Sequence, residues 1–246
     1  MLEAAIVAVT VELAKLSLKG ISTTLIGEGG RWRKIAEVDK AFYDIFPRGS
    51  QVVLVASAYN ARLEGFAYED RCTGIRDTIA LMSLSDYLAK AKIAVSVYDH
   101  ALTKSQESLL NEHLIVAGSP PFNEVADVLM ERCIPSGKLR FDFANRTIFF
   151  DGESKIDTED TVRGVIACLR NSVTEKAPPS KRVLLFAGTH QLGTHLAISY
   201  FINRDVQRAI RRLVRGKHGL NWAILVRGER TGLDIQHPTA ERLAYW

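Results

Sequence analysis

The hydrophobic pattern divides the chain into an N-terminal helical segment and a longer region in which strands and helices alternate. Residues 2–19 place apolar side chains at steps of three and four, which predicts an amphipathic helix, and residues 33–46 predict another. We therefore expect residues 1–48 to form a helical segment and residues 49–246 to form one α/β domain. The first helix is expected to dock on the main body, with oligomerisation or contact with a membrane surface as alternatives.

Within residues 49–246, unbroken apolar runs predict strands and amphipathic runs predict helices. The expected strands cover 51–58, 93–98, 114–117, 164–169, 183–187 and 222–226, and the expected helices cover 77–91, 123–132, 193–202 and 205–215. Residues 139–150 alternate around Asn145 and Arg146, as in an antiparallel hairpin. Apolar strands that alternate with helices are typical of a parallel sheet that is buried on both faces. We therefore expect a mostly parallel sheet with helices on both faces and one antiparallel hairpin.

Two stretches of the chain repeat one pattern. Residues 114–124 and 184–194 each run from an apolar strand, through Ala-Gly and a hydroxyl residue, into an amphipathic helix. At the carboxyl end of a parallel strand, the amides and the dipole of the following helix favour an anion. The repeat therefore predicts a ligand site at which the turns of Gly118 and Gly188 open onto a shared crevice with their amides facing inward.

The second of these stretches, Gly188-Thr-His-Gln-Leu-Gly-Thr194, carries the clearest ligand-binding pattern. Gly188 and Gly193 permit a tight turn and a close approach of backbone to a ligand or to the sheet. Thr189 and Thr194 offer hydroxyls to phosphate, ribose or carboxylate oxygens, and His190 is a candidate acid–base catalyst. The alternative is an ordinary strand–helix turn in which Thr194 is the N-cap.

The first stretch, Gly118-Ser-Pro-Pro-Phe-Asn-Glu124, holds a loop made rigid by two prolines. Gly118, Ser119 and Asn123 are expected to contact the ligand, and the Asn123 amide could read a base or sugar edge. Glu124 is a candidate general base or ribose ligand. The alternatives are that Asn123 caps the helix and that Glu124 only compensates the helix dipole.

A third place where a hydroxyl and a glycine precede a helix is Thr73-Gly74. Ser57 and Asn60 follow the first strand, so all four residues are expected to face the same cleft as ligand-binding residues. Ordinary turn chemistry explains them equally well.

Composition narrows the class of protein without naming a reaction. Of the 246 residues, 47% are hydrophobic and 24% charged, as in ordinary globular proteins, and a net charge of +4 suits an anionic ligand but falls short of a dedicated nucleic-acid binder. Three scattered cysteines predict reduced thiols, no metal site and a cytoplasmic location. No apolar run reaches the length of a membrane span. The arginines of residues 204–217 favour a solvated helix face, with contact to nucleic acid or an acidic partner as the alternative.

The order of four motifs resembles a bacterial and archaeal family of Rossmann-like domains. The motifs, which span about residues 50–230, are Thr73-Gly-Ile75, Gly118-Ser-Pro-Pro-Phe-Asn-Glu124, Gly164-Val-Ile-Ala-Cys-Leu-Arg-Asn171 and Ala187-Gly-Thr-His-Gln-Leu-Gly-Thr-His-Leu-Ala197. The resemblance implies a Rossmann-like α/β fold and a sensory or effector-associated module. The family has Gly-Gly-Pro-x-x-Asn in its first loop and Asp-Tyr-Gly-Leu-Ile in its third motif. Here Ser119 replaces the second glycine, and Val162-Arg163 stands in place of Asp-Tyr.

Three functions are therefore expected, in order of support. The first is a sensor that binds a small, anionic, nucleotide-like ligand and signals through oligomerisation or a partner protein. The second is a nucleotide- or nucleoside-processing hydrolase or transferase that uses Glu124 or His190. The third is an interaction module built on the N-terminal helix and the arginine stripe. The sequence identifies no cofactor.

Overall fold

The computed structural model describes residues 45–47, 49–57, 59–62, 69–72, 75–203, 205–207, 209–210, 219–232 and 234–246. The helix predicted over 2–19, most of the helix predicted over 33–46, and the Thr73-Gly74 pair lie outside the described residues. The same holds for the basic residues of the arginine cluster, which are Arg204, Arg208, Arg211, Arg212, Arg215 and Lys217.

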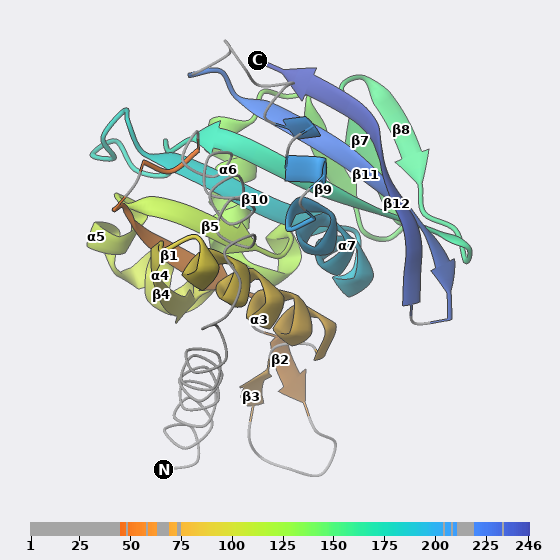
Figure 1. Ribbon diagram of the computed structural model, residues 1–246, viewed down its shortest axis with the longest axis horizontal. Coiled ribbons are helices and arrows are strands. Elements are labelled where there is room, and N and C mark those ends of the chain that lie inside the picture. The colour runs from red at the N-terminus through yellow and green to blue at the C-terminus, as the bar shows by residue number, and fades with distance from the viewer. Residues whose placement is uncertain are drawn as a thin grey trace, which may run out of the picture.

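A seven-stranded sheet with the order β12-β11-β9-β10-β5-β1-β4 forms the centre of the molecule (Figure 1). Its strands are β1 (Gln51–Ala56), β4 (Ala94–Asp99), β5 (His113–Ala117), β9 (Thr161–Arg170), β10 (Arg182–Gly188), β11 (Trp222–Thr231) and β12 (Asp234–Tyr245). Strands β4, β1, β5 and β10 are parallel to one another, whereas β9, β11 and β12 are joined by antiparallel ladders. The sheet is therefore mixed.

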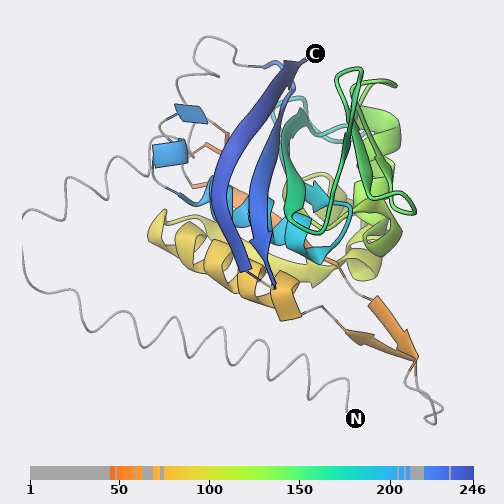
Figure 2. The same ribbon diagram turned by 90° about the vertical axis from the view of Figure 1, so that its right-hand side faces the viewer.

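Each face of this sheet is covered by a different set of elements, as Figure 2 shows. Helices α3 (Ile75–Lys90) and α7 (Gln191–Phe201) pack on one face. Helix α6 (Glu124–Cys133) shares the other face with a three-stranded antiparallel sheet of β6 (Leu139–Asp142), β7 (Thr147–Phe150) and β8 (Glu153–Ile156). The remaining elements are the hairpin of β2 (Tyr59–Arg62) and β3 (Glu69–Cys72) and the short helices α4 (His100–Ser105), α5 (Glu107–Leu110) and η1 (Pro120–Phe122).

The expectation of a Rossmann-like, mostly parallel sheet with helices on both faces is wrong. Strands β9 and β12 run opposite to the other five strands, so that the pairings on both sides of β9 and between β11 and β12 are antiparallel. In addition, a second sheet occupies much of the face that was assigned to helices. An apolar run indicates only that a strand is buried on both of its faces. Strand β9 is antiparallel to its neighbours, but it is buried on both faces just as a strand of a parallel sheet is. Strand direction was therefore not readable from the pattern. Strands β8 and β12 were missed because their side chains are mostly exposed and polar.

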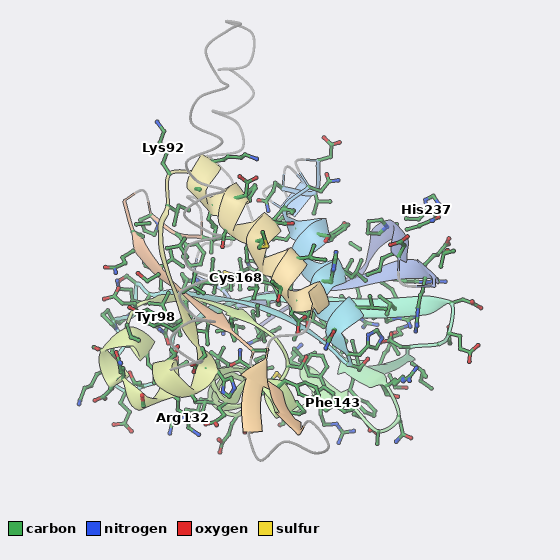
Figure 3. All side chains as sticks on the ribbon, turned by 90° about the horizontal axis from the view of Figure 1, so that it is seen from below. Lys92, Tyr98, Arg132, Phe143, Cys168 and His237 are labelled. Carbon is green, nitrogen blue, oxygen red and sulfur yellow. The ribbon has the colours of Figure 1, made fainter. Side chains whose placement is uncertain are left out.

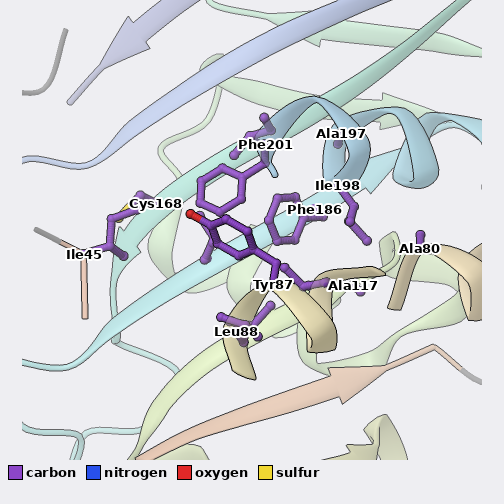
Figure 4. Packing of buried hydrophobic residues seen from close by; sticks show 14 of the residues in the cluster. Ile45, Ala80, Tyr87, Leu88, Ala117, Cys168, Phe186, Ala197, Ile198 and Phe201 are labelled. Atoms are coloured by element: carbon purple, nitrogen blue, oxygen red, sulfur yellow. The ribbon is translucent and has the colours of Figure 1, made fainter. Parts of the chain in front are cut away.

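Most of the predicted elements are nonetheless present. Strands β1, β4, β5, β9, β10 and β11, helices α3, α6 and α7, and the hairpin of β6 and β7 all coincide with predicted runs. Aromatic rings fix α3 and α7 on the sheet (Figure 4): the Phe186 ring lies 5.2 Å from that of Phe201, which lies 6.5 Å from that of Tyr87, both edge to face. These contacts hold the end of α7, at Phe201, against the sheet and against α3.

Three glycines allow the first turn of α7 to touch the backbone of the sheet. A Cβ atom on Gly164 of β9 would lie 2.2 Å from the Gly193 carbonyl oxygen, and one on Gly193 would lie 2.4 Å from the Arg163 carbonyl oxygen. A Cβ atom on Gly188 would lie 2.6 Å from the Gly193 Cα atom. Only residues without side chains permit this approach, so the glycines of the second motif serve close packing.

We expect Gly164→Ala to lower the free energy of unfolding by about 2–3 kcal/mol, because its methyl group would collide with backbone that cannot rotate away. Chemical denaturation checks this. Gly228→Ala on neighbouring β11 is the matched control, since the nearest atoms to its methyl group would be side-chain carbons of Ile235 and Leu196 and not backbone atoms. An equal loss in both variants would show that the backbone contact is unimportant.

Candidate functional site

The carboxyl ends of the parallel strands β1, β5 and β10 meet at one edge of the sheet. The chain passes from β1 to β4 on one side and then to β5 on the other, so β1 and β5 form a topological switch point, where open α/β sheets bind ligands. Here the space is filled. Ser57 is buried after β1 and donates its hydroxyl hydrogen to the Ala117 carbonyl oxygen at 2.8 Å. A Cβ atom on Gly118 would lie 1.6 Å from the Ser57 hydroxyl oxygen.

The two repeated loops lie side by side at this edge, as the sequence predicts. However, the Gly118 amide donates to the Phe186 carbonyl oxygen at 2.8 Å. The Gly188 amide donates to the Ser119 hydroxyl oxygen at 2.9 Å, and that hydroxyl donates to the Gly188 carbonyl oxygen. Ser119 therefore bridges the two loops and both glycine amides are used inside the protein. The expectation that these amides face a shared crevice is wrong.

Asn123 is the N-cap of α6. Its side-chain oxygen accepts hydrogen bonds from the amides of Val125 and Ala126 at 3.1 and 3.2 Å, and its amide group donates to the Ala117 carbonyl oxygen. The Glu124 amide donates to His100 Nδ1 at 3.4 Å, and a Glu124 carboxylate oxygen lies 2.8 Å from Lys104 Nζ. The start of α6 is thus satisfied from within the chain. The alternative in which Asn123 caps α6 is therefore correct.

The start of α7 is different. His190 is its N-cap, with an extended backbone, but its imidazole makes no capping hydrogen bond. In the described part of the chain, the amides of Gln191 and Leu192 have no hydrogen-bond acceptor. Thr194 lies buried inside the first turn, so the alternative in which Thr194 is the N-cap is wrong. The first two amides of α7 therefore have no acceptor among the described residues.

A buried carboxyl group lies beside this helix start. Asp157 lies between β8 and β9, and its side chain is fully buried. Its Oδ2 atom accepts a hydrogen bond from the Thr189 hydroxyl at 2.7 Å and lies 3.7 Å from His190 Nε2. Among the described residues, no donor makes a hydrogen bond to its Oδ1 atom, which lies 3.6 Å from Arg163 Nη1. The fold thus brings together Thr189 and His190, which the sequence singled out, with two residues that it did not.

Arg163 is held mainly by other partners. Its Nε atom donates to Glu241 Oε2 at 2.7 Å, and Nη1 donates to the Ile156 carbonyl oxygen at 2.7 Å. These bonds join β9 to β12 and to the end of β8. Because Glu241 already pairs with the guanidinium, Asp157 is not required to neutralise it. The buried Asp157 carboxylate is therefore not explained by a structural ion pair alone.

Burial dominates the protonation of this cluster. It raises the pKa of Asp157 to about 6, although the Thr189 hydrogen bond and the Arg163 charge oppose the shift. Burial also lowers the pKa of His190 to about 4, and the charges of Arg146 and Arg230 lower it further. At neutral pH, His190 is therefore an uncharged imidazole in a positive electrostatic potential, next to a carboxylate that is mostly ionised.

An aromatic cluster lies close to the same edge. Phe122 of η1 packs edge to face on Phe143 with ring centroids 6.3 Å apart, and Phe143 stacks on Phe141 at 5.8 Å. All three rings are half-buried. The Arg146 amide donates to the Phe143 carbonyl oxygen, and the Asp157 amide donates to the Arg146 carbonyl oxygen at 2.9 Å. The β6–β7 turn, seen at Phe143 in Figure 3, thus connects the aromatic cluster to the Asp157 loop.

Sequence reasoning located part of this site. Thr189 and His190 are in it, whereas Gly193 and Thr194 are buried in α7 and Asn60 lies on the β2–β3 hairpin. Asp157 and Arg163 were missed as site residues. Asp157 stands in a polar loop without a motif, and Arg163 was noted only because Val162-Arg163 departs from the pattern of the family that the chain was expected to resemble.

The described residues contain no group of three or more histidine, cysteine, aspartate or glutamate side chains that could hold a metal ion. Among the helices that the structure describes, none is long and apolar enough to cross a bilayer. No protein-family model, curated protein or solved structure shows significant similarity to this chain. The resemblance to a sensory or effector-associated family therefore stays a prediction.

We expect Asp157→Asn to stabilise the protein at neutral pH. Because the folded pKa of about 6 exceeds the ordinary value, the folded state binds the extra proton between about pH 4 and 6, and the stability contributed by Asp157 falls as the pH rises through that window. The gain in free energy of unfolding should be near zero at pH 4 and reach roughly 2 kcal/mol above pH 7. Denaturant titrations across this range measure it.

Asp142→Asn is the control of opposite sign for this measurement. Asp142 is exposed, and hydrogen bonds from Asn145 hold its pKa below the ordinary value, so its removal should destabilise the protein at neutral pH. A less stable Asp157→Asn variant at pH 7–8 would contradict the account, because it would mean that the Arg163 charge outweighs the cost of burial.

Proposed function

We propose that this protein binds a small, anionic, nucleotide-like ligand at the head of α7, where β10 ends. The observation that carries the proposal is the partly exposed His190, whose imidazole makes no capping hydrogen bond at the start of α7 and lies under the positive potential of Arg146 and Arg230. Helix amides without acceptors and nearby arginines are the groups that bind phosphate and carboxylate in proteins.

The contrast between the two repeated loops supports this placement. At α6, Asn123 and His100 already accept the first-turn amides, and Ser119 occupies the space between the loops. At α7, the amides of Gln191 and Leu192 have no acceptor among the described residues and are available to a ligand. The proposed site is therefore narrower than the one predicted from the repeat and includes only the second loop.

The aromatic cluster favours a ligand with a base attached to the anion. Phe143 lies in the turn that also carries Arg146, and its half-buried ring packs against that of Phe122 from η1. Stacking of a nucleobase on such rings contributes about 1–3 kcal/mol per base. An anion site beside an aromatic surface fits a nucleotide better than inorganic phosphate. Signalling through oligomerisation or a partner protein stays a prediction, since the N-terminal helix on which it rests lies outside the described residues.

A panel of nucleoside mono-, di- and triphosphates, cyclic dinucleotides and dinucleotides, with inorganic phosphate, tests the proposal by calorimetry on the full chain. At least one nucleotide should bind more tightly than phosphate. His190→Ala should weaken it at least tenfold without unfolding the protein, because the imidazole caps nothing. His237→Ala is the matched control, since this exposed histidine of β12 lies at the periphery in Figure 3, well away from Phe143.

A second variant separates charge from shape. Arg146 has a positive φ of 48°, which asparagine tolerates, so Arg146→Asn should lower the affinity and its salt dependence together. Arg140→Asn changes an arginine on the outer face of the same hairpin, over the Phe149 ring, and should leave the affinity unchanged. Folded protein that binds no member of the panel would overturn the proposed function.

A further inference from the structure

We propose that His190 is a general base, positioned by Asp157, and that the protein hydrolyses a phosphoester bond of the ligand held at the head of α7. This inference rests on the proposed function, because it needs the anion at that helix start. It adds a reaction and assigns roles to two side chains: His190 contacts the reacting water, and Asp157 acts through His190.

His190 and Asp157 lie close enough to interact. His190 Nε2 is 3.7 Å from Asp157 Oδ2, which is too long for a hydrogen bond. A small rotation of the imidazole ring would bring the two atoms within hydrogen-bond distance. The His190 side chain is 26% exposed while that of Asp157 is fully buried. With Nε2 directed to the carboxylate, Nδ1 is the nitrogen left to take a proton from water. In hydrolytic general bases, one imidazole nitrogen faces a carboxylate and the other faces the reacting water or hydroxyl.

Burial of the Asp157 carboxylate is unfavourable for the stability of the fold. A buried carboxylate oxygen without a hydrogen bond destabilises a fold, and Asp157 Oδ1 has no hydrogen-bond donor within the described part of the chain. Arg163 is already paired with Glu241, so Asp157 is not needed to balance its charge. Thr189 donates to the other oxygen and fixes the orientation of the carboxyl plane. Buried polar groups that the fold does not require are typical of sites where they serve a reaction.

Burial together with Arg146 and Arg230 lowers the pKa of His190 to about 4, so the imidazole is uncharged at neutral pH and can accept a proton. An anionic ligand beside the ring opposes the charges of the two arginines and raises this pKa toward neutrality, where a general base works best. The same arginines and the α7 amides stabilise the negative charge that develops on the phosphoryl oxygens during attack. As His190 takes the proton, the ionised Asp157 stabilises the imidazolium that forms.

The reaction balances with water as the only co-reactant. His190 Nδ1 removes a proton from a water molecule while the water oxygen forms a bond to phosphorus. The bond from phosphorus to the leaving oxygen breaks, and the leaving oxygen keeps the bonding electrons. The imidazolium then returns the proton to that oxygen or to solvent, and His190 is uncharged again. No electron transfer takes place, and the products are a phosphate and an alcohol or a shorter phosphate.

The first test does not need a substrate. The His190 pKa is followed by nuclear magnetic resonance in the full chain, in Asp157→Asn and in Asp160→Asn, which changes an exposed acid of the same loop. Removal of the Asp157 charge should lower the His190 pKa, and Asp160→Asn should leave it unchanged. An unchanged His190 pKa in Asp157→Asn would overturn the positioning role, because the two groups would then not interact.

The second test measures turnover of every nucleotide that binds in the calorimetric panel, by chromatography of the products. His190→Gln should lower the rate by about 10²- to 10⁴-fold, the usual contribution of a general base. Asp157→Asn should lower it about 10²-fold or more and should remove a decline that the unmodified protein shows below about pH 6, where Asp157 takes up its proton. Asp160→Asn should match the unmodified protein in rate and pH profile.

The outcomes separate this inference from the proposed function. Binding without turnover, or turnover that survives His190→Gln, would overturn the inference and leave ligand binding in place. Absence of any binding in folded protein would overturn the proposed function first. Turnover that requires His190 and follows the Asp157 pH profile would support both.

Discussion

The approach of the α7 backbone to the sheet is the contact on which the rest of the molecule depends. Gly164, Gly188 and Gly193 meet without side chains between them, so the first turn of α7 begins directly at the end of β10. That approach leaves His190 at the head of the helix and Thr189 over Asp157. A longer connection would let the helix start turn to solvent, and the carboxyl group would lose its partner.

The two similar loops perform different tasks because of what fills the space between them. Ser119 bonds both to the amide and to the carbonyl of Gly188, and Asn123 satisfies the start of α6. The first loop therefore holds the sheet edge together. In the second loop, two amides have no acceptor within the described part of the chain, and the His190 imidazole is partly exposed. This loop lies beside a carboxylate that is costly to bury. A fold selected only for stability would have replaced Asp157 by an amide or an apolar residue.

The sequence pattern predicted most of the elements and one half of the site. Buried strands such as β5 and β10 are readable because every residue is apolar, and α6 is readable from its stripe and from Asn123. The direction of β9 was not readable, because burial on both faces looks the same in either direction. Thr189 and His190 stand in a motif, whereas Asp157 reaches them only through the tertiary path of β8 and β9. The local sequence around Asp157 therefore does not indicate that this residue lies beside Thr189 and His190.

The most direct measurement of the account is a titration of isotope-labelled protein with a bound nucleotide, followed through backbone amide resonances. The account predicts large shifts at Gln191 and Leu192, whose amides have no acceptor in the described residues, and small ones at Gly118 and Gly188, whose amides are already bonded. Shifts centred on Gly118 and Gly188, with Gln191 and Leu192 unmoved, would contradict it.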